Sequence, residues 1–163
     1  AYSGRRELLE QLAKEEPLVV TRTKSGEDYL NTLNRIRFFV SADVGMGEYM
    51  IKNFEALAAG CILLAEDQGK SENDALGFRD MENVMLFRKA SEAVEKIALV
   101  ERNPDLGRRI AVAGEALAWE RFGFSAIGPK IAKAISKPMR QRGKPNVLDQ
   151  VYARIFHPWL LAE

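Results

Sequence analysis

Glu55 is the residue whose type and setting most suggest chemistry. It lies inside a mostly apolar segment, directly before the run Ala-Leu-Ala-Ala-Gly. A carboxylate among small residues is costly to bury without a partner. A pair of ribose hydroxyls is a suitable partner, because one carboxylate accepts two hydrogen bonds from a diol. From spacing alone, a solvated glutamate on a helix face is the simpler interpretation.

A loop with two glycines, Gly45 and Gly47, precedes the helix that is expected to carry Glu55. Glycine lets a backbone approach a ligand closely, and the unpaired amides at a helix N-terminus favour an anion such as a phosphate. Glu48 and Lys52 fall in this loop or in the first turn of the helix. A tight turn would explain the glycines equally well, and the sequence has neither a GxGxxG nor a Walker signature.

The elements that must position these residues alternate between strand and helix. Apolar, β-branched and aromatic residues predict strands over 36–41 and 61–65, and helical spacing predicts the helix 49–59 between them. Residues 18–20 predict a short buried strand, and residues 83–87 predict another. Short connections between alternating strands and helices indicate an α/β fold with a parallel sheet covered by helices on both faces.

Further helices are expected around this sheet. The spacing predicts one over about 5–15, one beginning near Ser25, and three more between about 93 and 131. Asn103 and Pro104 are suited to begin the second of these three. Gly60 is placed to end the helix that carries Glu55. The polar run over 67–74 predicts a loop.

Composition excludes several classes of protein. The chain has 163 residues, with 24 Lys and Arg against 23 Asp and Glu, so its net charge of +1 does not indicate a nucleic-acid binder driven by bulk charge. The chain has one cysteine, Cys61, and one histidine, His157. These numbers exclude an internal disulfide and a Cys-rich or His-rich metal site. No apolar run is long enough for a membrane span, and we expect a cytoplasmic protein, with the membrane periphery as the other location considered.

The segment KNFEALAAGCILLAEDQG, residues 52–69, resembles the nucleotide-sugar signature in the C-terminal domain of GT-B glycosyltransferases. It is most similar to the spore-coat (CgeB-like) and group 1 branch. The order of the flanking segments FFVSA, CILLAE and GFRDMENVMLF is also that of the family. The resemblance covers about residues 1–136 and implies a Rossmann-like parallel sheet flanked by helices, which is one half of a GT-B fold.

The resemblance also implies roles for single residues. Glu55 matches the glutamate that binds the ribose hydroxyls of the donor nucleotide. Many relatives have a second glutamate, facing the donor sugar, eight positions earlier. That position is Gly47 in this chain, and Glu48 lies one residue away. The two-glutamate pattern is therefore broken or shifted here.

Three basic residues match positions that face the diphosphate in this family. Lys52 stands where the spore-coat-like relatives often carry arginine. Gly4-Arg5-Arg6 resembles the glycine-and-basic turn after the first strand of the domain. Ordinary helix-start charge explains Arg5 and Arg6 equally well.

These observations predict the donor-binding half of a glycosyltransferase. It would hold a nucleoside-diphosphate sugar for transfer to a carbohydrate or other hydroxyl-bearing acceptor, against an N-terminal GT-B half. No cofactor or metal is expected, and no catalytic base is identified, so the isolated chain should bind donor weakly without turnover. Two alternatives stay open: a non-catalytic Rossmann-like interaction module, and a receiver domain in which Asp43 alone follows a strand.

The domain organisation is predicted as three parts. Residues 1–136 form the nucleotide-sugar-binding domain, 137–145 a basic linker broken by Pro and Gly, and 146–163 a C-terminal amphipathic helix. The abrupt start of the sheet suggests the C-terminal half of a larger protein. The apolar face of the last helix is expected to pack against the partner half or to drive self-association.

Overall fold

The computed structural model describes residues 3–42 and 47–138. The chain divides into two compact units, 1–127 and 128–163, and the helix α7 (Phe124–Ile135) spans the division. Gly45, Asp43, most of the predicted linker 137–145 and all of the predicted helix 146–163 lie outside the described residues.

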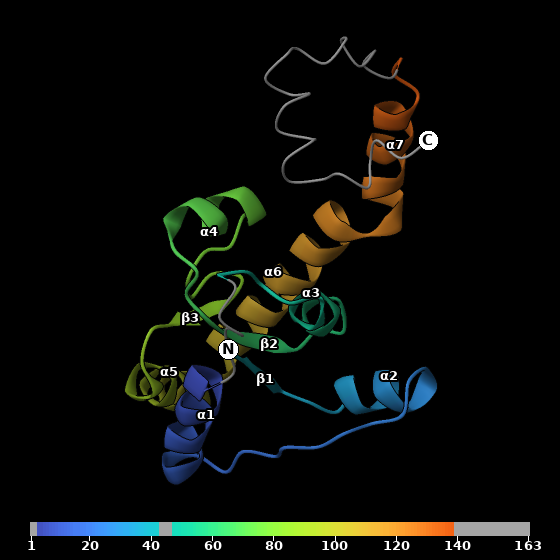
Figure 1. The fold of residues 1–163 in the computed structure, drawn as a ribbon. Helices are drawn as coiled ribbons and strands as arrows, with labels where there is room; N and C mark the ends of the chain where they lie inside the picture. The colour runs from blue at the N-terminus through green and yellow to red at the C-terminus, as the bar shows by residue number, and fades with distance from the viewer. Residues whose placement is uncertain (1–2, 43–46, 139–163) are drawn as a thin grey trace, which may run out of the picture. The chain divides into compact units, whose positions relative to one another are not determined.

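A parallel sheet of three strands forms the centre of the first unit (Figure 1). Its strands are β1 (Phe38–Ser41), β2 (Ile62–Glu66) and β3 (Met85–Phe87), in that order across the sheet. Phe38 lies opposite Ile62, and Leu64 opposite Met85. Because the strands are parallel, their carboxyl ends meet at one edge, where ligands of open α/β sheets bind.

Six helices precede α7 in the described part of the chain. They are α1 (Ser3–Glu15), α2 (Glu27–Leu33), α3 (Ile51–Ala58), α4 (Lys70–Leu76), α5 (Ala90–Arg102) and α6 (Pro104–Phe122). Asn103 caps α6 by accepting a hydrogen bond from the Leu106 amide, with Pro104 in the first turn, as predicted. Gly60 has a φ of +77° just after α3, a left-handed conformation that glycine adopts without strain, which confirms its predicted place at the end of the helix.

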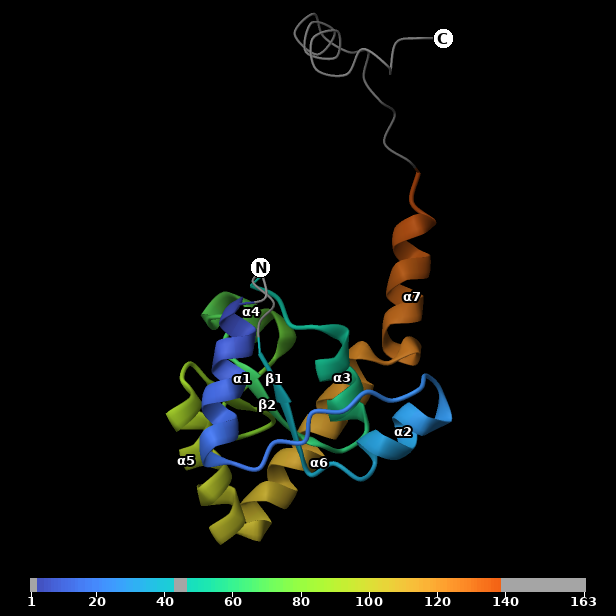
Figure 2. The ribbon, with the colours of Figure 1, turned by 60° about the horizontal axis from the view of Figure 1, so that its bottom comes forward.

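Helices cover both faces of the sheet, which confirms the predicted α/β architecture (Figure 2). Alternate residues of β2 point to opposite faces. Ile62 and Leu64 pack with α1 and α5, whereas Leu63 packs with α3 and the second half of α6. The two clusters give the sheet the buried, apolar strands typical of parallel pairing.

The predicted strand over 18–20 is wrong. These residues have no regular secondary structure, and the side chains of Val19 and Val20 are 88% and 87% exposed. Leu18 alone packs against the core. β-branched residues favour a strand only where a neighbouring strand and a buried face are available, and the three-stranded ladder in the described part of the chain does not include this segment.

The predicted loop over 67–74 is wrong in its second half, because α4 begins at Lys70. The helix buries none of its own residues, so it lacks the apolar period by which helices are predicted. Leu76 packs against the core cluster around Leu63, and polar contacts hold the rest of the helix: Asn73 accepts a hydrogen bond from the Tyr49 hydroxyl and donates one to Asp67. None of the described helices combines the length and the apolarity needed to cross a bilayer.

Candidate functional site at the carboxyl edge of the sheet

The N-terminus of α3 lies beside the carboxyl edge of the sheet, as the sequence predicts. The chain returns from β1 through Gly47, whose φ of +67° is left-handed, and reaches α3 at Met50. Met50 is the N-cap residue, and among the described residues no side chain caps this end of the helix. The Asn53 amide donates to the Met50 carbonyl at 2.9 Å, so the amides of Ile51 and Lys52 are the ones suited to an anionic ligand.

Arg5 is brought to this helix end and Arg6 is not. Nη1 of Arg5 lies 3.4 Å from the Met50 sulfur. Arg6 instead pairs with Glu10 at 2.7 Å on the exposed side of α1, where its side chain is 81% exposed. Figure 2 shows α1 beginning at the end of the sheet where α4 also lies. Of the two arginines that the sequence singles out, only Arg5 contacts the residue at which α3 begins.

Lys52 and Glu55 both face Tyr29 of α2. The Tyr29 hydroxyl donates a hydrogen bond of 2.7 Å to Oε2 of Glu55, and Nζ of Lys52 lies 5.9 Å from the centre of the Tyr29 ring. Burial, and next the Glu55 carboxylate, raise the pKa of Tyr29 well above its usual range. Glu55 is therefore half-buried with a defined partner, rather than a fully solvated glutamate.

Asn53 points to the other side of α3. Residues two apart on a helix lie about 200° apart around its axis, so Asn53 faces away from Glu55, two residues further along α3. Its side chain is 2% exposed and lines a narrow crevice at the ends of β1 and β2. Glu48, on the exposed rim of that crevice, is thereby separated from Glu55 by the helix.

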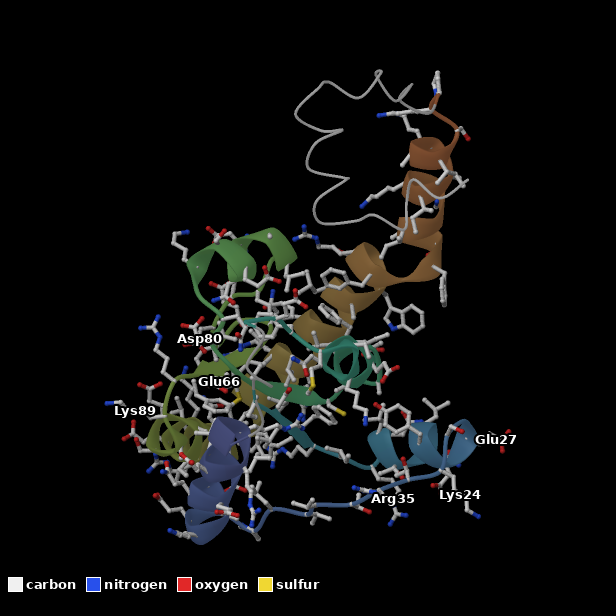
Figure 3. The ribbon with its side chains drawn as sticks, in the orientation of Figure 1. Lys24, Glu27, Arg35, Glu66, Asp80 and Lys89 are labelled. Carbon is white, nitrogen blue, oxygen red and sulfur yellow. The ribbon has the colours of Figure 1, made fainter. Side chains whose placement is uncertain are left out.

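The crevice contains an unpaired polar atom. Oδ1 of Asn53 is buried and accepts no hydrogen bond from the residues that the structure describes. The other walls of the crevice are Ser41, Ala42, Glu48, Tyr49, Glu66 and Gln68, and they leave no volume that a water molecule could occupy. Leaving a buried acceptor unpaired costs on the order of 1–3 kcal/mol. Figure 3 labels Glu66 on the sheet, whereas the labelled Lys24, Glu27 and Arg35 lie around α2.

A hydrogen-bonded network supports one wall of the crevice. The Tyr49 hydroxyl donates to Asn73 at 2.6 Å and accepts from the Gln68 amide at 3.4 Å, and burial raises the pKa of Tyr49 to about 12. Asp67 accepts from Asn73, from the Gly69 amide and from the guanidinium of Arg88, at 2.7–2.9 Å. These bonds, led by that from Asn73, lower the pKa of Asp67.

A wider hollow of about 430 Å³ lies beyond this network, between α4, the end of β3 and α5. Its charged groups pair with one another: Asp67 with Arg88 at 2.8 Å, and Asp80 with Lys96 at 2.6 Å. The paired charges leave it less suited to a diphosphate than the N-terminus of α3. In the described part of the chain, no group of three acidic, His or Cys side chains is placed to hold a metal ion.

Sequence reasoning missed two residues of this region, Tyr29 and Asn53. Tyr29 precedes Glu55 by 26 residues, and nothing in the local sequence links the two. Asn53 carried a signal, since it is a polar residue three and four positions before Ala56 and Leu57, with which it shares the buried side of the helix. The structure thus adds a partner for Glu55 and a second, separate polar position on α3.

Comparison with known proteins identifies the family of the chain. No curated protein matches the chain. A model of a family described as glycosyl transferase-like matches residues 5–126, which include Arg5, Lys52 and Glu55 and most of the first unit. The match extends over three quarters of the sequence, and the chain therefore belongs to this glycosyl transferase-like family.

Proposed function

We propose that this chain binds the nucleoside diphosphate of a sugar nucleotide and holds it for glycosyl transfer. The observation that carries the proposal is the contact of Arg5 with Met50 at the N-terminus of α3, which no described side chain caps, with Lys52 and Glu55 on the same helix. Membership of the glycosyl transferase-like family supports a role in glycosyl transfer in general.

The diphosphate is assigned to the N-terminus of α3. Backbone amides there favour phosphate oxygens, and Arg5 supplies a charge-assisted donor close by. Lys52, in the first turn, adds a second positive charge on the side that faces α2. In glycosyl transfer this group leaves as a diphosphate, so the same cations and amides would stabilise its developing charge.

The ribose is assigned to Glu55. One of its carboxylate oxygens accepts from Tyr29, and a carboxylate has about four lone-pair sites, so it can accept ribose hydroxyls as well. Tyr29 then acts as a positioning residue, because its hydrogen bond fixes the orientation of the carboxylate before the nucleotide arrives.

The donor and its acceptor are proposed to meet in a cleft between this domain and an N-terminal GT-B domain. Binding and orientation are the contribution of the present chain. The closer assignment to the spore-coat (CgeB-like) type of GT-B enzyme depends on the signature at residues 52–69. The acceptor is a carbohydrate or another hydroxyl-bearing molecule, and no catalytic residue is assigned on this chain.

Ligand-observed NMR of the purified chain against UDP, GDP, CDP, ADP and dTDP tests the proposal. We expect one or more of these to bind weakly, and the binding to be lost in a folded Glu55→Ala variant. Glu101→Ala is the matched control, because Glu101 is exposed near the end of α5, across the sheet from α3. Absence of binding by the unmodified chain, or binding unchanged by Glu55→Ala, would contradict the assignment.

A further inference from the structure

Asn53 is the feature of the site that the proposed function leaves unexplained. Asn53 is only 2% exposed, yet none of the described residues donates a hydrogen bond to its side-chain oxygen, and the crevice around it has no room for water. Buried polar side chains in native proteins are nearly always paired, so an orphaned acceptor calls for a specific cause. A ligand that supplies the missing donor is such a cause.

The chemistry of the crevice selects the kind of group that would enter it. A carbonyl oxygen needs a donor, and the diphosphate of a sugar nucleotide offers none at neutral pH. Glu48 lines the same crevice at its exposed rim, and its carboxylate would repel a phosphate. A hydroxyl group satisfies both conditions, because it donates to the Asn53 oxygen and can lie beside carboxylates.

The position of Asn53 on α3 identifies the part of the ligand concerned. It lies in the first turn, next to Lys52, but on the opposite side of the helix from Glu55. A ligand whose diphosphate is held at the helix N-terminus and whose ribose is held at Glu55 would extend its other end toward Asn53. That other end is the sugar.

We propose that the side-chain oxygen of Asn53 accepts a hydrogen bond from a hydroxyl group of the donor sugar, and so distinguishes a sugar nucleotide from a free nucleoside diphosphate. The proposal rests on the proposed function and deepens it. Asn53 touches the substrate in this account, but it takes no proton and forms no bond to the reacting carbon.

Entry of the sugar requires one wall of the crevice to move. Tyr49 and Gln68 are joined to each other, and Tyr49 is joined to α4 by its bond to Asn73. Glu48 is instead exposed on the rim, in the segment that leads into α3. Movement of the wall that contains Glu48 would open the crevice. Asn53 and the wall formed by Tyr49 and Gln68 would stay in place.

The test compares nucleoside diphosphates with the matching sugar nucleotides on the full chain. The probes are UDP with UDP-glucose and UDP-galactose, GDP with GDP-mannose, and ADP with ADP-glucose, measured by NMR titration. In Asn53→Leu, we expect the Kd of the sugar nucleotide that the wild type binds to rise about tenfold, as for the loss of one hydrogen bond. The Kd of the matching diphosphate should change less than about twofold.

Two further variants keep the test decisive. Asn53→Ala gives the same comparison if the leucine does not fit, with circular dichroism to verify folding. Ile110→Val, a small truncation in the core cluster on the opposite face, controls for changes in stability alone. We also expect the Tm of Asn53→Leu to equal or exceed that of the wild type, because the unpaired buried oxygen is removed.

The outcomes separate the two proposals. Equal weakening of diphosphate and sugar nucleotide, or no change in either, would overturn the role of Asn53 and leave the proposed function intact. A wild-type chain that binds no diphosphate would overturn the proposed function, and the role of Asn53 with it. A preference for sugar nucleotides that appears only with added Mg²⁺ would assign the crevice to a cation and would also overturn the role of Asn53.

Discussion

The Tyr29 hydroxyl donates a hydrogen bond of 2.7 Å to the carboxylate of Glu55, across the interface between α2 and α3. The bond joins Glu55, the residue assigned to the ribose, to α2, which precedes α3 by about 20 residues in the chain. Glu55 is thus held in one orientation by a neutral donor, which leaves its negative charge available to a ligand.

The first prediction concerns this bond. Tyr29→Phe should lower the free energy of unfolding by about 1–2 kcal/mol, because a hydrogen bond to a charged group is lost while the ring remains. Urea denaturation of Tyr29→Phe, Glu55→Gln and the double variant would give the coupling between the two residues. Additive effects of the two single changes would show that the bond contributes no stability.

The second prediction uses the two neighbouring arginines of α1. Arg5→Gln should raise the Kd of a bound nucleoside diphosphate about fivefold to tenfold, since a charge-assisted contact is removed. Arg6→Gln is the matched control, because Arg6 pairs with Glu10 away from α3, and its Kd should stay near that of the wild type. Equal effects of the two changes would indicate a general electrostatic attraction instead of a contact at α3.

The third prediction concerns stability in acid. Hydrogen bonds from Asn73, Gly69 and Arg88 lower the pKa of Asp67. A group with a lowered folded pKa stabilises the protein above the unfolded value of about 3.9, and this stabilisation is lost as the pH falls through the folded pKa. The urea concentration at the midpoint of unfolding should therefore decrease as the pH is lowered below about 4.

Asp67→Asn should be less stable than the wild type at pH 7 and should lose less stability on acidification. Asp105→Asn is the control, because Asp105 is 76% exposed and pairs only with the neighbouring Arg108 among the described residues. A wild-type acid dependence that Asp67→Asn leaves unchanged would show that other carboxyl groups cause it.

The fourth prediction concerns Cys61, whose side chain is fully buried and whose thiol donates to the Leu33 carbonyl at 3.4 Å. Burial raises its pKa to about 11, so little thiolate is present at pH 8. A thiol reagent such as DTNB should react with the folded chain on the order of 100-fold more slowly than with the urea-unfolded chain. Similar rates in the two states would contradict the burial of Cys61.

The sequence predicts the sheet and the helices that are amphipathic, because hydrophobic periodicity reports burial directly. It predicts β1, β2 and α3 within a few residues, and with them the place of Glu55 and Lys52. It fails for α4, which polar contacts hold, and for residues 18–20, where β propensity has no neighbouring strand to act with.

The contacts of the site depend on tertiary structure and are not visible in the local pattern. Arg5 and Arg6 are equivalent in sequence. Consecutive residues of a helix point in directions about 100° apart, and only Arg5 lies beside Met50. Tyr29 reads as part of an ordinary amphipathic helix until the packing of α2 on α3 brings it to Glu55. The sequence shows which of these residues are charged or polar, but it does not show which other residues they contact.

Diphosphate binding at α3 can be observed residue by residue in ¹H–¹⁵N correlation spectra of the labelled chain, recorded during titration with the nucleoside diphosphate that binds best. Binding at α3 predicts that the amides of Ile51, Lys52 and Asn53 shift together and saturate with one Kd, while amides of α5 around Lys96 stay in place. Shifts confined to the hollow around Asp80, Arg88 and Lys96, or no shifts at the start of α3, would contradict the account.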